Sequence, residues 1–239
     1  MARLLVGLPT LQGDLAKYAS RFDMVELRPV DVALPKPGTL RKWRKAVPPS
    51  FVFSVVLPRV VGELTPGPAL DEAVTITLEV AAALEARCVL LQTPATVRPT
   101  AANKKRLAAV FERIPHEGTV RCWEPSGLWE REEVLATARA VGVLPVFDAA
   151  REQPGGGPIL YTRLRALGKS TALGAAALER VAERLRRRRE AFVIVEGPGE
   201  ASRIRQALTH ELARLPARSS GVTVVRPGTS TLVAEDEEQ

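Results

Sequence analysis

The stretch that decides the fold is residues 88–124, which read CVLLQTPATVRPTAANKKRLAAVFERIPHEGTVRCWE. An apolar run at Cys88–Gln92 is followed by Thr100–Arg113, where apolar residues recur every three or four positions, and then by a second run at Thr119–Glu124. Such short apolar runs are typical of strands that are buried on both faces, and the spacing between them indicates an amphipathic helix. The stretch therefore predicts a strand, a helix and a second, parallel strand.

The same alternation extends through the chain. Six further strands are predicted, at Arg3–Gly7, Met24–Arg28, Val52–Leu57, Val143–Asp148, Ile159–Arg165 and Phe192–Glu196. Six further helices are predicted, at Gly13–Ser20, Thr39–Ala46, Ala69–Ala86, Glu130–Val141, Ala175–Arg189 and Glu200–Arg214. Eight strands in 239 residues, with no break in composition, predict an α/β protein with one (β/α)8 barrel of the TIM type over residues 1–216. Residues 217–239 are expected to form a C-terminal extension with a short extended segment at Val222–Val225 and a disordered acidic end.

One connection of the predicted barrel is irregular. Residues 149–158 read AAREQPGGGP, and this density of proline and glycine opposes a stable helix. We therefore expect the helix that should follow the sixth strand to be missing or reduced to a turn.

The charge balance indicates an affinity for anions. The chain has 34 Lys and Arg against 27 Asp and Glu, a net charge of +7, and four of the acids lie in the last five residues. A basic protein attracts nucleic acids, phosphorylated metabolites and acidic surfaces. Arginine outnumbers lysine 27 to 7 and alanine is abundant, as GC-rich codons produce, so charge alone predicts only weak nucleic-acid binding.

Targeting and redox signals are few. No apolar run approaches the about 18 residues of a membrane span, and the start MARLLVGLPT lacks the pattern of a secretory leader. We expect a soluble, cytoplasmic protein with no membrane partner. Cys88 and Cys122 are too few for a disulfide framework and are expected to be buried free thiols.

Polar residues concentrate at the ends of the predicted strands, where barrels of this class carry their sites. They are Glu26, Arg28, Arg59, Gln92, Glu124, Asp148, Arg163, Arg165 and Glu196. The two-residue period of a strand predicts that Glu26, Glu124, Asp148 and Arg163 point inward and meet around one pocket. Charges in such numbers are rarely buried unless they are paired or used. They form either a functional site or a structural ring of ion pairs.

The order of several segments resembles a known family. The segments FDMVELRPV, LRKWRKAVPPSFVFSVVLPRVV, VLLQTPATVRPT, VRCWEPSGLW, GVLPVFDAA and ILYTRLRALG are similar to those of the domain of unknown function 72 family, also called YecE-like. These proteins are (β/α)8 barrels with no assigned reaction. The resemblance extends from about Gly7 to Leu208 and identifies the family's motif residues as Glu26, Trp43, Phe51, Phe53, Gln92, Pro94, Glu124, Trp129, Asp148 and Arg163.

The chain departs from the family pattern at several places. Ser126 stands where the family has the arginine of Glu-x-Arg, and Arg165-Ala166 stands where it has His-Gly. Glu196 and Gly197 stand where an asparagine is usual, and the aromatic pair that follows the strand-two glutamate is absent. The resemblance therefore implies a divergent member.

These residues favour a binder of a small anionic or polyhydroxylated metabolite, or an acid/base enzyme acting on one. Arginines at positions 28, 59, 163 and 165 would bind phosphate or carboxylate groups through paired N–H donors. Glu124 and Asp148 would transfer protons, and Glu26 would orient these two carboxylates or share their charge. Gln92, Trp129 and Glu196 would line the site. The alternatives are a barrel that binds or processes nucleic acid at the same basic end, and a scaffold without catalysis.

The remaining motifs give weaker predictions of function. His116 lies before the fifth strand and His210 in the last helix, so no zinc or other metal site is assigned, although carboxylates at the strand ends could hold Mg²⁺. Residues 168–171 (GKST) lack the earlier glycine of a phosphate-binding P-loop, since that position is Arg163. Lys169, Ser170 and residues 197–199 form either a phosphate-binding pair of loops or two plain turns. The run Arg186–Arg189 is expected to be a solvated helix end.

Overall fold

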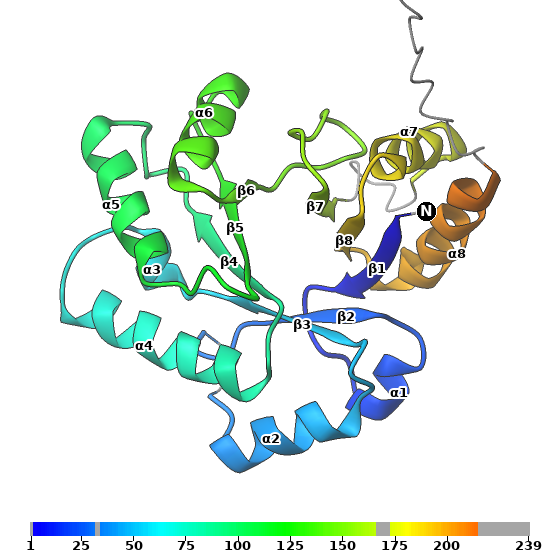
Figure 1. The fold of residues 1–239 in the computed structure, drawn as a ribbon, viewed down its shortest axis with the longest axis horizontal. Helices are drawn as coiled ribbons and strands as arrows, with labels where there is room; N and C mark the ends of the chain where they lie inside the picture. Colours follow the sequence, from blue (N-terminus) through cyan, green and yellow to red (C-terminus); the bar gives the residue numbers. More distant parts are fainter. Residues whose placement is uncertain (1, 32–33, 166–172, 215–239) are drawn as a thin grey trace, which may run out of the picture.

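The computed structural model describes residues 2–31, 34–165 and 173–214, and within them eight parallel strands form a nearly closed barrel (Figure 1). The strands are hydrogen-bonded in the order β6-β5-β4-β3-β2-β1-β8-β7. The first and last strands of the chain pair along five residues, from Arg3 with Glu190 to Gly7 with Ile194. The strand bounds are β1 Arg3–Leu8, β2 Met24–Leu27, β3 Val52–Val56, β4 Cys88–Thr93, β5 Val120–Pro125, β6 Leu144–Pro145, β7 Ile159–Leu164 and β8 Glu190–Val195.

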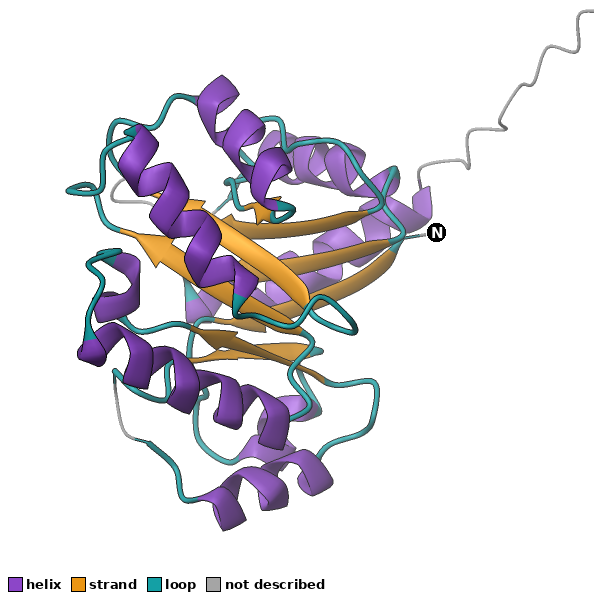
Figure 2. Ribbon diagram, turned by 60° about the vertical axis from the view of Figure 1, so that its left-hand side comes forward, coloured by secondary structure: helices purple, strands orange, loops and turns teal. Residues whose placement is uncertain are grey.

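Helices surround this sheet, as Figure 2 shows. Those within the described residues are α1 Leu15–Ala19, α2 Pro37–Ala46, α3 Arg59–Gly62, α4 Pro68–Ala83, α5 Ala101–Glu112, α6 Arg131–Val141, α7 Ala175–Arg186 and α8 Pro198–Arg214. No helix in the described part of the chain is long and apolar enough to cross a membrane. The eight parallel strands and the helices around them confirm the predicted TIM-type barrel. The short α3 was not predicted, because four residues carry no periodic signal.

The seam between β6 and β7 is the irregular part of the barrel. None of residues 146–158, all of which are described, is helical, so the predicted loss of the helix after the sixth strand is confirmed. The expected strand Val143–Asp148 was too long, because the chain changes neighbours inside it. Val146 N–H donates to the Trp123 carbonyl oxygen on β5 (2.8 Å), and Phe147 already bridges to Thr162 on β7.

Two arginines of α7 and the turn after it hold the loop that replaces the missing helix. Arg184 donates to the Ala149 carbonyl oxygen and to Gln153 Oε1, and Arg188 donates to the carbonyl oxygens of Gly155 and Gly157 (2.6 Å each). Burial lowers the pKa of both guanidinium groups. The prediction of a solvated helix end is therefore wrong for Arg188, because its N–H groups replace water at the carbonyls of a segment with no helix of its own.

Two apolar clusters make up the core. The larger one fills the space between the strands and the helices, and the smaller one fills the barrel interior with residues such as Met24, Leu90 and Phe192. Cys88 and Cys122 belong to the interior cluster, and burial raises the pKa of both thiols. The prediction of buried free thiols is confirmed. Residues 166–172 and 217–239, with the GKST segment and the predicted extension, lie outside the described residues.

Candidate binding site at the carboxyl end of the barrel

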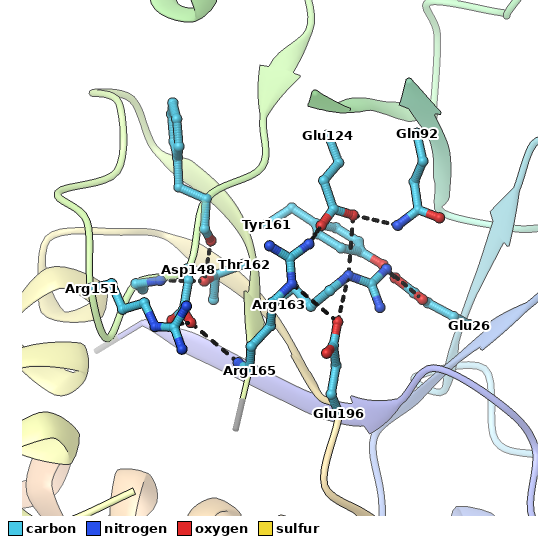
Figure 3. Close-up of polar contacts among 12 residues, drawn as sticks. Glu26, Gln92, Glu124, Asp148, Arg151, Tyr161, Thr162, Arg163, Arg165 and Glu196 are labelled. Atoms are coloured by element: carbon cyan, nitrogen blue, oxygen red, sulfur yellow. Dashed lines mark hydrogen bonds and ion pairs between the residues drawn. The ribbon is translucent and has the colours of Figure 1, made fainter. Parts of the chain in front are cut away.

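Arg163 on β7 joins two carboxylates that come from two other strands of the barrel (Figure 3). Its Nη2 donates to Glu26 Oε1 at 2.7 Å and Oε2 at 2.8 Å, and its Nε donates to Glu124 Oε2 at 3.1 Å. Glu26 comes from β2 and Glu124 from β5, so these residues can meet only because the sheet curves round on itself. The inward register predicted from the two-residue period is confirmed for these three side chains. We call this end of the barrel the mouth.

The ion pairs at the mouth are buried. Arg163 is 3% exposed and Glu26 is 0% exposed. Burial alone would lower the pKa of the Arg163 guanidinium, but the carboxylates of Glu26 and Glu124 raise it above its ordinary value. The guanidinium of Arg163 is therefore held in its charged form.

Tyr161, which was not predicted as a site residue, completes the surroundings of Glu26. Its hydroxyl donates to Glu26 Oε1 at 2.5 Å and lies 3.0 Å from Ser54 Oγ on β3. Burial, and then the charge of Glu26, raise the pKa of the Tyr161 phenol, which keeps it a donor. The available signal was its position two residues before Arg163, on the same face of β7.

Glu124 is the most connected carboxylate of the mouth. It accepts hydrogen bonds from Gln92 Nε2 (2.6 Å), from Arg163 and from Arg165 Nη2. Gln92 Oε1 in turn accepts from Arg28 Nη2 at 2.6 Å. Arg165 has 43% of its side chain exposed, and its Nε donates to Glu196 Oε1 at 3.3 Å. A continuous polar chain thus runs from Arg28 to Glu196.

Asp148 lies beside this network without joining it. Its Oδ1 accepts from Ala150 N–H at 2.9 Å, its Oδ2 accepts from Arg165 N–H at 3.2 Å, and Arg151 Nε is 3.6 Å away. Figure 3 shows it set apart from Glu26 and Glu124. The carboxylate fixes the turn after β6 and the backbone of Arg165. Of the four residues expected to meet around one pocket, Glu124, Asp148 and Arg163 line the same small cavity, and Glu26 does not.

Two cavities open onto the mouth, and Glu124 and Arg165 line both. The larger, of about 460 Å³, also has Arg28, Arg59 and Gln92 in its wall. The smaller, of about 210 Å³, has Trp129, Asp148 and Arg163 in its wall. We call the larger one the mouth cavity. Its volume lies in the range of small-molecule sites.

Trp129 and Arg59 take different positions in these walls. Trp129 is buried, donates its indole N–H to the Val97 carbonyl oxygen (2.8 Å) and packs edge-on against Trp123. Arg59 has 82% of its side chain exposed and pairs with Glu63 at 3.2 Å, and its backbone N–H donates to Asp31. Trp129 therefore contributes a rigid wall, and Arg59 an exposed charge at the rim.

The described residues contain no group of three or more His, Cys, Asp or Glu side chains that is arranged to hold a metal ion. At the mouth, the carboxylates of Glu26 and Glu124 face Arg163. Lys169 and Ser170 of the proposed phosphate loops lie outside the described residues. The Mg²⁺ expectation stays a prediction.

Comparisons with known proteins agree with this architecture. A DUF72 family protein from Enterococcus faecalis V583 has a TM-score of 0.69 and 19% identity, over 89% of this chain and 98% of its own. A DUF72 family protein from Thermotoga maritima MSB8 has a TM-score of 0.63 and 19% identity, over 87% and 97%. Endonuclease IV from Thermus thermophilus has a TM-score of 0.59 and 14% identity, over 90% and 100%.

At identities this low, the TM-scores show a shared fold alone. Among curated proteins, no sequence relative is found. A family model described as "Protein of unknown function DUF72" matches residues 6–223, which is most of the chain. The resemblance seen in the sequence is thus confirmed, and the chain belongs to the DUF72 family.

Proposed function

We propose that the mouth cavity binds a small anionic or polyhydroxylated metabolite and that Glu124 exchanges a proton with it. The observation that carries the proposal is the cavity of about 460 Å³ whose wall combines Arg28, Arg59 and Arg165 with the carboxylate of Glu124. Guanidinium groups bind carboxylate and phosphate oxygens through paired N–H donors, so this wall suits an anion.

The exposure of the two central arginines assigns them different roles. Arg163 is buried and bound to Glu26 and Glu124, so it keeps its place when a ligand enters. Arg165 is half-exposed and bonds Glu124 and Glu196. A ligand anion would draw Arg165 from Glu124 Oε1, because a new charged acceptor competes for the same N–H groups. Glu124 would then have a free oxygen at the cavity and could act as a general base.

The other predicted residues support this arrangement. Glu26 holds Arg163, and Gln92 orients Glu124 while binding Arg28. Asp148 accepts a hydrogen bond from the backbone N–H of Arg165, and Glu196 accepts one from the Arg165 side chain. Trp129 forms part of the wall of the smaller cavity. In this proposal, Asp148 positions Arg165 and is not itself a proton donor.

Ligand-induced thermal stabilisation tests the proposal. Phosphorylated sugars, free sugars and dicarboxylates should be screened with the full chain, with and without MgCl₂, because a ligand that binds the folded state raises Tm. A hit should lose its effect in Arg28→Gln/Arg165→Gln. Glu124→Gln should keep the fold and change affinity or turnover. The matched change Glu112→Gln on α5 should also keep the fold but change neither affinity nor turnover. No stabilisation by any class, or equal stabilisation of all variants, would reject the mouth cavity as a ligand site.

A second candidate function is nucleic-acid binding at the basic mouth. The net charge of +7 favours it, and so does the fold shared with a neighbour named as an endonuclease. Sequence-independent contacts to phosphate predict weak binding that falls steeply with salt. Fluorescence anisotropy with labelled DNA and RNA should show this loss between low and moderate salt. Selective binding that persists at high salt would place this function first.

A further inference from the structure

A pocket of about 430 Å³ lies at the end of the barrel opposite the mouth. Its wall contains the first residues of β5, β6 and β7, together with the end of α6. The charged or titratable side chains among its described lining residues are Arg87, His116, Arg121 and Arg139, and none of these lining residues is Asp or Glu. We call this the lower pocket.

Arg121 on β5 is the buried cation of the lower pocket. It is 7% exposed, and its Nη1 lies 3.1 Å from the Phe111 carbonyl oxygen and 2.9 Å from His116 Nε2, while Nη2 donates to the Gly142 carbonyl oxygen at 2.8 Å. Within the described ranges, no carboxylate lies within ion-pairing distance of it, and its Nε makes no hydrogen bond. The charge is held by carbonyl dipoles at the ends of α5 and α6 and by the His116 ring. Burial accordingly lowers the pKa of this guanidinium.

The other two arginines add charge that neighbouring acids offset only in part. The Arg139 side chain is exposed on the last turn of α6 and makes no hydrogen bond or ion pair to the described residues. Arg87 donates to the Gly118 carbonyl oxygen at 2.6 Å and lies 3.6 Å from Glu190 Oε2. Glu190 also pairs with Arg3, so two arginines share its single negative charge. The exposed Glu117, next to His116, is not part of the lining.

We propose that the lower pocket binds an oxyanion of the phosphate class, such as the phosphate or pyrophosphate group of a small molecule. Three guanidinium groups converge on one cavity without a carboxylate in its wall, and an anion would supply the counter-charge that Arg121 and Arg139 lack. Guanidinium N–H pairs match the oxygens of a phosphate group, and the cavity has the size of a small-molecule site. This site is separate from the mouth cavity and does not depend on the function proposed there.

Isothermal titration with inorganic pyrophosphate tests the proposal. The parent protein should carry Arg28→Gln/Arg59→Gln, which weakens anion binding at the mouth and leaves the lower pocket intact. Adding Arg87→Gln/Arg139→Gln should weaken pyrophosphate binding at least about tenfold, because two charge-assisted contacts are lost. The matched control is Arg98→Gln, an exposed arginine after β4 that removes the same kind of charge elsewhere. It should change affinity less than about twofold.

Two results would overturn the lower-pocket site. One is the absence of pyrophosphate binding by the parent protein. The other is an equal loss of affinity in Arg98→Gln and in the pocket variant, which would show diffuse attraction by net charge. Thermal melts followed by circular dichroism check folding. If Arg87→Gln destabilises the protein through Glu190, Arg139→Gln alone should still give an intermediate loss, because Arg139 makes no contact that the fold needs.

Discussion

Among the described residues, each end of the barrel holds one buried arginine, and the two have opposite kinds of partner. Arg163 at the mouth meets Glu26 and Glu124, whose charges raise its pKa. Arg121 at the lower pocket meets carbonyl oxygens and His116, and burial lowers its pKa. Carboxylates give a buried cation a full counter-charge, whereas carbonyl dipoles give it hydrogen bonds and leave its charge to act on a ligand. Whether a buried arginine indicates an anion site therefore depends on whether its partners are carboxylates or carbonyl oxygens.

The largest effect is expected from removing the mouth arginine. Arg163→Met leaves Glu26 and Glu124 buried without their cation, and breaking a buried ion pair in this way costs about 3–5 kcal/mol. Urea denaturation should show this loss in the free energy of unfolding. Arg163→Met/Glu26→Gln should recover part of it, because one uncompensated charge is gone. A loss below about 1 kcal/mol for the single variant would mean that the network is not a coupled unit.

A smaller loss is expected at the lower pocket. Arg121→Met removes donors from the carbonyl oxygens of Phe111 and Gly142. Phe111 keeps its hydrogen bond from Ile114 N–H, so the expected cost of about 1–3 kcal/mol comes mainly from the Gly142 carbonyl oxygen left unsatisfied. The same denaturation experiment measures it. No charge is stranded, since no described carboxylate depends on Arg121. If Arg121→Met were as costly as Arg163→Met, the contrast between the two ends would fail.

Tyr161→Phe should have a still more limited effect. Glu26 loses one donor but keeps both hydrogen bonds from Arg163, so about 1.5 kcal/mol should be lost, the low end for one hydrogen bond to a charged group. Tyr18→Phe is the control without a charged partner, because its buried hydroxyl donates to the Met24 carbonyl oxygen and accepts from Leu8 N–H. Equal losses in both variants would show that Glu26 gains nothing particular from Tyr161.

The smallest effect concerns the barrel interior between the two ends. Burial raises the pKa of the Cys88 and Cys122 thiols, so both have less thiolate than an ordinary cysteine at any pH below that raised value. The folded protein should react slowly with Ellman's reagent at a mildly alkaline pH, and both thiols should react promptly in guanidinium. Fast labelling of the folded protein would reveal an opening from the mouth or the lower pocket into the interior.

The sequence predicted the barrel because apolar runs and helical periodicity are local signals, and the observed strands mostly end within one or two residues of the prediction. It also predicted the inward positions of Glu26, Glu124 and Arg163, since a strand alternates its faces. The short β6 was missed because Val143–Asp148 is apolar almost throughout, and composition does not reveal a change of neighbouring strand at Phe147.

Other parts of the site depend on contacts between distant residues. Asp148 was predicted as a member of the cluster, but the turn that follows β6 uses its carboxylate for backbone N–H groups. Tyr161 was not predicted as a site residue, because nothing local shows that its hydroxyl reaches Glu26, 135 residues earlier. The lower pocket was not predicted, since Arg87, Arg121 and Arg139 are brought together only by the closed sheet.

The pairing of β1 with β8 has a consequence for synthesis on the ribosome. Because β1 precedes β8 in the chain, one edge of β1 has no partner until β8 has also emerged. An unpaired strand edge can pair with another nascent chain and nucleate aggregation. The segment Leu4–Leu8 is apolar, and Arg3 is the charged residue of this strand. Chaperone capture of the nascent chain at this edge is therefore expected to last until translation passes Val195.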